Sequence, residues 1–264
     1  MSSDGNWAII TGASSGIGKA LALEFARGGF HVLLTGRSNE ALAQVARECT
    51  SQFHVSTEVI PADLSLPEST DELVATIAAK PRRYEVLVNN AGFGIHGDFS
   101  QTEIQNEIAL VNVQLGAALK LAKAVLPGMV ARRTGRILNV GSVYCYAPVP
   151  FQSVYSACKA FLLSFSAAIR DELSATGVTV TVFCPGVTQT EFRSRAGIAE
   201  KDRNSGMTAE AAARIAYQET MRGKAVVIPG LANRLFVCVA KLMPSSLFTG
   251  IVRYINRQRG LSHP

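Results

Sequence analysis

The stretch WAIITGASSGIG, residues 7–18, joins a short apolar run to a glycine-rich turn. Its first part, Trp7–Thr11, consists mostly of apolar residues and predicts a buried β-strand. Glycines follow at positions 12, 16 and 18, and the apolar residues after Gly16 recur at helical spacing. A strand, a glycine turn and a helix in this order predict the beginning of an α/β fold.

The alternation of strand and helix continues along the chain. Further strands are predicted at residues 31–36, 55–60, 85–89, 136–140, 178–184 and 225–228. Helices are predicted at residues 16–28, 38–51, 67–79, 102–126, 153–175 and 208–222, with Ser38 or Asn39 as an N-cap. Seven strands that alternate with helices imply a parallel, doubly wound sheet with helices on both faces. We therefore expect one α/β domain over residues 1–230 and a helical extension over residues 231–264.

Composition excludes several classes of protein. Hydrophobic residues make up 48% of the 264 and charged residues 17%, so the chain can bury a large core and is not disordered. The five cysteines are scattered and never form C-x-x-C, which argues against a disulfide framework or a metal site and favours a reducing, cytoplasmic setting. We expect no signal peptide at residues 1–7 and no run as long as a membrane span.

The net charge of +6 is concentrated at the C-terminal end. Residues 231–264 carry five of these charges and no Asp or Glu, which leaves +1 for residues 1–230. The pI of 9.2 is therefore a property of the extension and does not indicate a nucleic-acid-binding protein.

The extension itself has a helical pattern. Its apolar positions recur at i, i+1, i+4, i+5 and i+8 on either side of Pro244: Leu235, Phe236, Val239, Ala240 and Met243, then Leu247, Phe248, Ile251, Val252 and Ile255. This spacing predicts two amphipathic helices with cations on the other face. They could pack on the body beside a substrate pocket, form a subunit interface, or lie on an anionic membrane surface.

The glycine turn indicates the kind of ligand. At a strand–turn–helix junction the backbone N–H groups and the positive helix end can face a pyrophosphate, and an ordinary tight turn between strand and helix is the alternative. An acidic residue after the second strand would bind the ribose hydroxyls of NAD, but Arg37 stands there. An arginine can pair with a 2′-phosphate, so we expect NADP(H); the alternative is a solvated surface arginine.

Tyr155 and Lys159 lie four residues apart on a predicted helix and therefore share a face. An ammonium beside a phenol lowers the phenol pKa, which would make Tyr155 usable as a proton donor and acceptor near neutral pH. Taken singly, a packing tyrosine and a solvated lysine are the ordinary alternatives, and Ser142 could be a loop serine or an N-cap.

Seven motifs occur in the order and approximate spacing of the short-chain dehydrogenase/reductase family: TGASSGIG (11–18), Asp63, NNAG (89–92), Asn112, Ser142, YSACK (155–159) and PGVTQT (185–190). The chain resembles that family over roughly residues 7–230. The resemblance implies a Rossmann-type sheet that binds the nucleotide at the carboxyl ends of its strands. It also implies a homodimer or homotetramer formed through the long helices 102–126 and 153–175.

The resemblance assigns cofactor roles position by position. It places the pyrophosphate and ribose at the glycine turn, the 2′-phosphate after the second strand, the adenine at Asp63, and the nicotinamide at the PGVTQT loop. The residues implied are Gly12, Ser14, Ser15, Gly16, Ile17, Gly18, Arg37, Ser38, Asp63, Leu64, Asn90, Ala91, Gly92, Tyr155, Lys159, Pro185, Gly186, Val187 and Thr190.

The resemblance also implies a complete catalytic set. Tyr155 would be the general acid and base, Lys159 would hold the nicotinamide ribose, and Ser142 would orient the substrate carbonyl. Asn112 would sit at a helix kink and hold a water next to Lys159. The implied activity is NADPH-dependent carbonyl reduction; a nucleotide-sensing protein without turnover and an NADP-dependent alcohol oxidiser are the alternatives.

Three loops would supply the substrate pocket: Phe93–Gly97, Val143–Phe151 and the residues after Thr190. Their apolar and aromatic members are Phe93, Ile95, Val143, Tyr144, Tyr146 and Phe151, which suit a small hydrophobic ketone or aldehyde. His96 could reach this pocket, whereas Cys158 is expected to be a buried packing thiol. Residues 191–207 are polar and predict a lid.

Overall fold

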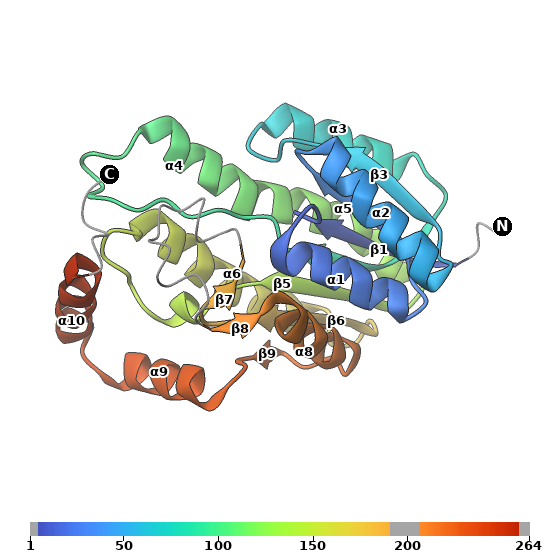
Figure 1. The fold of residues 1–264 in the computed structure, drawn as a ribbon. Coiled ribbons are helices and arrows are strands. Elements are labelled where there is room, and N and C mark those ends of the chain that lie inside the picture. The colour runs from blue at the N-terminus through green and yellow to red at the C-terminus, as the bar shows by residue number, and fades with distance from the viewer. Residues whose placement is uncertain (1–4, 191–205, 259–264) are drawn as a thin grey trace.

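A seven-stranded parallel sheet forms the centre of the protein in a computed structural model that describes residues 5–190 and 206–258 (Figure 1). In sheet order the strands are β3 (Thr57–Pro61), β2 (His31–Gly36), β1 (Asn6–Thr11), β4 (Arg83–Asn89), β5 (Gly135–Val140), β6 (Val178–Phe183) and β9 (Val226–Val227). All seven predicted strands are confirmed, with ends that shift by two residues at most. From β1 the chain first adds β2 and β3 toward one edge of the sheet and then adds β4, β5, β6 and β9 toward the other edge, as in a doubly wound Rossmann-type sheet.

Helices cover both faces of the sheet. One layer consists of α1 (Gly16–Arg27), α2 (Asn39–Phe53) and α8 (Ala209–Met221), and the other of α3 (Pro67–Ala78), α5 (Ala117–Ala131) and α6 (Ser153–Glu172). Neighbouring strand residues alternate between the two layers: Leu34 packs with Phe25 on the first side, and Leu33 packs with Leu73 on the second. Burial on both faces explains why the strands are almost continuously apolar.

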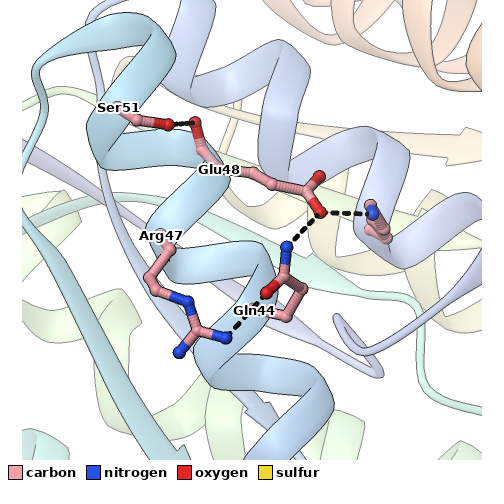
Figure 2. A network of polar contacts seen from close by, with 5 residues as sticks. Gln44, Arg47, Glu48 and Ser51 are labelled. Carbon is pink, nitrogen blue, oxygen red and sulfur yellow. Dashed lines mark hydrogen bonds and ion pairs between the residues drawn. The ribbon is translucent and has the colours of Figure 1, made fainter.

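Polar contacts hold α2 beside α1 (Figure 2). The Lys19 ammonium of α1 donates to the Glu48 carboxylate of α2 at 2.8 Å, and this hydrogen bond lowers the pKa of Glu48. Gln44 also donates to Glu48, and Arg47 donates to Gln44 along the exposed side of α2. Ser38 caps α2, since its hydroxyl oxygen accepts from the Ala41 N–H, as predicted. The Ala13 N–H donates to the Thr35 carbonyl oxygen at 3.2 Å, so the loops that begin α1 and α2 are neighbours.

The long helix predicted at 102–126 is interrupted. It consists of α4 (Ile104–Val111), a π-helical segment η1 (Asn112–Gly116) and α5. Together they form Ile104–Ala131, which contains an 18-residue window with a mean hydropathy of 1.5 and is, within the described part of the chain, the one helix long and apolar enough to span a membrane. The helix is part of the protein core, since the side chains of Leu110, Leu121 and Met129 are fully buried. A core helix of this fold can therefore also be long and apolar enough to span a membrane.

The two helices predicted in the C-terminal extension are confirmed as α9 (Leu231–Leu242) and α10 (Ser245–Gln258), with Pro244 between them. Both lie at the end of the molecule away from the N-terminus (Figure 1). A small sheet of β7 (Thr188–Gln189) and β8 (Met207–Thr208) was not predicted. Residues 191–205 of the predicted lid, and Arg259 of the basic extension, lie outside the described residues.

Candidate active site

A cleft of about 350 Å³ opens at the carboxyl ends of the strands, where open α/β sheets bind ligands. Loops that follow β1, β2, β3, β4, β5 and β6 all contribute to its walls. Most of the predicted site residues line it: Gly12, Ser14, Ser15, Gly16, Ile17, Gly18, Arg37, Asp63, Leu64, Asn90, Ala91, Gly92, Ser142, Tyr155, Lys159, Pro185, Gly186, Val187 and Thr190. Ser38 and Asn112 are not among the lining residues.

The glycine turn after β1 forms a cradle of backbone. Gly12 has a φ of 64°, and a Cβ there would lie 2.9 Å from the Ala91 Cα. A Cβ on Gly18 would lie 2.1 Å from the Gly12 carbonyl oxygen, which no real side chain allows. The Asn90 amide donates to the Thr11 carbonyl oxygen at 2.9 Å and ties this turn to the end of β4. Such a cradle at the N-terminus of α1 fits the pyrophosphate of a dinucleotide.

Arg37 and Asp63 mark one end of the cleft. Burial raises the pKa of Asp63, but hydrogen bonds from Ser65 and the charge of Arg37 outweigh it and hold that pKa below its ordinary value. Arg37 is exposed at the cleft and so remains accessible to an anion. The Ser38 oxygen accepts from the Ala41 N–H at 3.3 Å as the cap of α2. This end therefore offers one guanidinium beside the backbone cradle.

Ser142, Tyr155 and Lys159 meet on the opposite side of the cleft. Ser142 follows β5 and caps a short 3-10 segment, η2 (Val143–Tyr146), where its hydroxyl oxygen accepts from the Tyr144 N–H at 3.2 Å. Tyr155 and Lys159 lie in the first turns of α6, and a hydrogen bond with Ser142 favours the ionised phenol. The Lys159 nitrogen lies 5.5 Å from the centre of the Tyr155 ring.

The predicted lowering of the Tyr155 pKa is wrong for this structure. Burial raises the pKa of Tyr155 well above its ordinary value, and this outweighs the hydrogen bond with Ser142. The Lys159 ammonium donates to the Val140 carbonyl oxygen at 2.8 Å, and its contact with the Tyr155 ring does not offset the effect of burial on the phenol pKa. Burial also lowers the pKa of Lys159, since a charge inside the protein is poorly solvated. The phenol is therefore protonated at neutral pH.

Asn112 begins the π segment between α4 and α5, so the helix is irregular where a kink was predicted. Its amide donates to the Ser65 carbonyl oxygen at 2.9 Å, which joins the long helix to the loop after β3. The predicted role in holding a water beside Lys159 stays a prediction. Cys158, by contrast, is the expected buried thiol, and burial raises its pKa to about 11.

The substrate end of the cleft is more polar than predicted. Phe93, Val143 and Tyr144 line it, while Ile95 packs in the cluster around Tyr155. Tyr146 and Phe151 are not lining residues, because η2 turns Tyr146 toward Cys145 and Cys184 and Phe151 is buried. The polar side chains there are those of His96, Gln152 and Asn256.

Asn256 was missed by sequence reasoning. It belongs to α10, is 3% exposed, and donates from its amide to the Pro150 carbonyl oxygen at 3.1 Å, in the loop before α6. The signal that could have found it is its spacing: Phe248, Val252 and Asn256 follow at intervals of four residues, so a polar residue interrupts an inward-facing row.

The first helix of the extension also contacts the site. The ring of Phe236 lies 6.4 Å from that of Tyr144, which in turn lies 6.4 Å from the ring of Tyr155. A Cβ on Gly186 would lie 2.1 Å from the Asn233 side chain, so α9 packs closely on the loop after β6. Three placements of the extension were predicted. Packing on the body beside the pocket is observed for the side of α9 that carries Phe236 and Asn233.

Comparisons with known proteins agree with this geometry. The sequence profile of the short chain dehydrogenase family matches residues 6–201. The very-long-chain 3-oxoacyl-CoA reductase of Mus musculus is 36% identical over 71% of this chain and 61% of its own length. The inactive hydroxysteroid dehydrogenase-like protein 1 of Homo sapiens is 36% identical over 69% of this chain and 55% of its own length. The chain thus spans less than two thirds of the length of these curated relatives.

A solved structure extends the similarity to nearly the whole chain. The short-chain dehydrogenase from Sphingobium yanoikuyae in complex with NADPH is 32% identical, with a TM-score of 0.81. The match covers 96% of this chain and 95% of that one.

Proposed function

Because the chain belongs to the short-chain dehydrogenase family, an oxidoreductase family, we propose that it is an NADPH-dependent reductase of hydrophobic ketones or aldehydes. The observation that carries this proposal is the meeting of Ser142, Tyr155 and Lys159 in one cleft with the glycine cradle. A proton donor beside a dinucleotide cradle is the arrangement that carbonyl reduction requires.

The residues of the cleft fit NADPH. The glycine cradle suits a pyrophosphate, and Arg37 supplies a positive charge where a 2′-phosphate would lie. The NADPH complex of the Sphingobium yanoikuyae relative supports this choice. When bound, NADPH supplies the hydride.

The protein contributes position and a proton. The Ser142 and Tyr155 hydroxyls are hydrogen-bonded to one another and together hold the carbonyl oxygen of the substrate. Because burial keeps the pKa of Tyr155 high, its phenol is protonated at neutral pH and can donate to the developing alkoxide. Lys159, one turn further along α6, stabilises the phenolate that remains. A protonated phenol is the form that donates a proton in the reductive direction; Asn112 would connect the proton to solvent.

The substrate end suits a molecule with an apolar body and a polar group near the carbonyl. Phe93, Val143 and Tyr144 supply apolar surface, while Gln152 and Asn256 supply hydrogen-bonding groups. The mouse relative is named for its very-long-chain 3-oxoacyl-CoA substrate, which combines an apolar chain with a carbonyl and supports this class.

A homodimer or homotetramer is also part of the proposal. Ile104 and Ile108 of α4 and Phe161 of α6 are exposed apolar residues on the helices expected to form the interface. All five cysteines are free thiols, which supports a reducing, cytoplasmic setting. Light scattering of the purified protein tests the assembly; a monomer at micromolar concentration would contradict it.

A nucleotide-sensing protein without turnover is the alternative, because the human relative is named as inactive. A panel of hydrophobic ketones, aldehydes and 3-oxoacyl thioesters, followed at the NADPH absorbance, separates the two functions. We expect NADPH oxidation that depends on the carbonyl. Tight NADPH binding without oxidation across the panel would support the sensor instead.

A further inference from the structure

The outward faces of α9 and α10 carry an unusual share of exposed apolar surface. Eight of the fifteen exposed large hydrophobic side chains in the described residues lie on these two helices: Leu231, Leu235, Val239, Leu242, Leu247, Ile251, Tyr254 and Ile255. Leu231 is 81% exposed and Leu242 is 80% exposed, so neither packs on the body. We call these eight side chains the outer apolar face.

The outer apolar face is continuous along each helix. On α9 its members follow at i, i+4, i+8 and i+11, and on α10 at i, i+4, i+7 and i+8, which places each set on one side of its helix. The other side of each helix is occupied, since Val237 and Phe248 are buried and Phe236 contacts Tyr144. The helices are therefore held on the body by one face and present the other outward.

The charge beside this face has one sign. The two helices carry four cations among the described residues: Arg234, Lys241, Arg253 and Arg257. Those of α9 also contact the body, since the Arg234 Nε donates to the Ile228 carbonyl oxygen and the Lys241 nitrogen lies 4.7 Å from the centre of the Tyr146 ring. Arg253 and Arg257 lie four residues apart and share a side of α10. The sequence from 231 to 264 contains no Asp or Glu. Apolar side chains flanked by cations alone are the composition of a helix that lies in the interface of an anionic bilayer.

A second copy of the chain fits this surface less well. A two-fold contact places the same patch against itself, so the cations of α9 and α10 would face their own copies with no carboxylate on either helix to offset them. An anionic bilayer offers both an apolar interior and negative headgroups. We propose that the outer apolar face docks the protein on an anionic lipid surface.

Docking of this face would leave α9 and α10 between the membrane and the substrate end of the cleft. The same two helices supply Asn256 to the cleft wall and Phe236 to the ring of Tyr144, so the lipid-facing surface and the substrate end belong to one pair of helices. In a reading that rests on the proposed reductase function, the substrate end would then lie close to a bilayer in which a hydrophobic carbonyl dissolves.

Co-sedimentation of the full chain with vesicles tests the proposal without any carbonyl substrate. One set of vesicles contains phosphatidylcholine alone and the other contains phosphatidylcholine with phosphatidylglycerol. We expect at least about tenfold tighter binding to the anionic vesicles, and a fall in binding as salt screens the headgroups. Equal, weak binding to both sets of vesicles overturns the proposal.

Two variants and a control locate the contact. The variant L235S/L242S/L247S removes three exposed leucines and should weaken vesicle binding at least about tenfold. The control L66S/V130S removes two exposed apolar residues that lie outside α9, α10 and the expected subunit interface, and it should bind as the parent does. R253Q/R257Q leaves the apolar residues in place and should lose most of the preference for anionic lipid. Unchanged binding by both test variants overturns the proposal, as does a shift in oligomeric state without vesicle binding, which would assign the face to self-association.

NADPH affinity and carbonyl reduction in vesicle-free buffer are measured on the same proteins. All variants should retain both, because none of the substituted residues lines the cleft. Vesicle binding by a protein that reduces no carbonyl would contradict the proposed function and leave the docking surface intact.

Discussion

The two ends of the cleft are built in different ways. The nucleotide end consists of backbone held by its own chain: Gly12 and Gly18 lie against neighbouring main chain, and Asn90 locks the turn to β4. The substrate end consists of side chains brought from distant elements, among them Tyr144 of η2, Gln152 before α6 and Asn256 of α10. The glycines of the backbone cradle tolerate almost no substitution. The side chains of the substrate end can be substituted, and the substrate changed, without a change of fold.

The largest effect is expected where the two ends meet. Tyr155→Phe removes the proton donor but keeps the ring, so turnover should fall by about 10²- to 10⁴-fold while NADPH affinity stays within about threefold. Steady-state kinetics and a fluorescence titration with NADPH measure the two quantities. Tyr217→Phe, on α8, is the matched control and should leave both unchanged. Near-parental turnover in the Tyr155 variant would remove the residue from the proton-donor role.

A methyl group in the backbone cradle should have the next largest effect. Gly18→Ala places a Cβ about 2.1 Å from the Gly12 carbonyl oxygen, so the turn must shift. Overpacking of this kind costs about 1–3 kcal/mol of stability. A shift of the turn that costs the same free energy in binding lowers NADPH affinity about 5- to 150-fold. Isothermal titration and thermal unfolding check the affinity and the fold.

The matched control for this substitution is Gly116→Ala, in the long helix, where a Cβ meets no atom within 4 Å. Its NADPH affinity should equal that of the parent. If the two alanine variants lose affinity equally, the close approach of α1 to the turn is not what shapes the nucleotide end.

A smaller effect at the nucleotide end is expected for the preference between NADPH and NADH. Arg37→Asp replaces a cation at the cleft with a carboxylate, so the ratio of NADPH to NADH efficiency should fall by at least about tenfold, the usual value of a charge-assisted hydrogen bond. Arg47→Asp makes the same charge reversal on α2 at a residue that donates to Gln44 away from the cleft (Figure 2). An equal effect of both reversals would point to general electrostatics instead of a 2′-phosphate contact.

The smallest effect is expected at the substrate end. Asn256→Leu keeps the size of the side chain and removes its hydrogen bond to the Pro150 carbonyl, so KM for carbonyl substrates should rise by about 2- to 12-fold, equivalent to about 0.5–1.5 kcal/mol. NADPH affinity should not change, because the substituted residue lies in the substrate wall. Gln258→Leu, at an exposed position of the same helix, should leave KM unaltered. An unchanged KM in the Asn256 variant would remove α10 from the substrate site.

Sequence reasoning succeeded where the signal is local. The strands follow from apolar runs, α1 from its spacing after Gly16, and the cradle from the interval between Gly12 and Gly18. Two amphipathic helices were predicted on either side of Pro244 because the pattern repeats there, and both are present. Periodicity reports which face of an element is apolar, but it does not show whether that face is covered: Leu235 and Leu247 belong to the predicted pattern and are exposed.

Sequence reasoning failed where the property of a residue depends on its surroundings in the folded protein. The Tyr155 pKa is set by burial, which the spacing to Lys159 does not reveal. Tyr146 was misplaced because a 3-10 turn redirects it, and Phe151 adopts a φ of 69°, which no pattern of aromatic residues predicts. Asn256 meets Pro150 across 106 residues of sequence, so only the folded chain brings the two together.

Transfer of an isotopic label tests the central claim most directly. The protein is incubated with NADPH that carries deuterium at both C4 positions of the nicotinamide and with a hydrophobic ketone, and the product is analysed by mass spectrometry. The account predicts an alcohol with a single deuterium on the former carbonyl carbon, formed by the parent and not by Tyr155→Phe. Absence of labelled alcohol from every carbonyl of the panel, with NADPH bound, would contradict it.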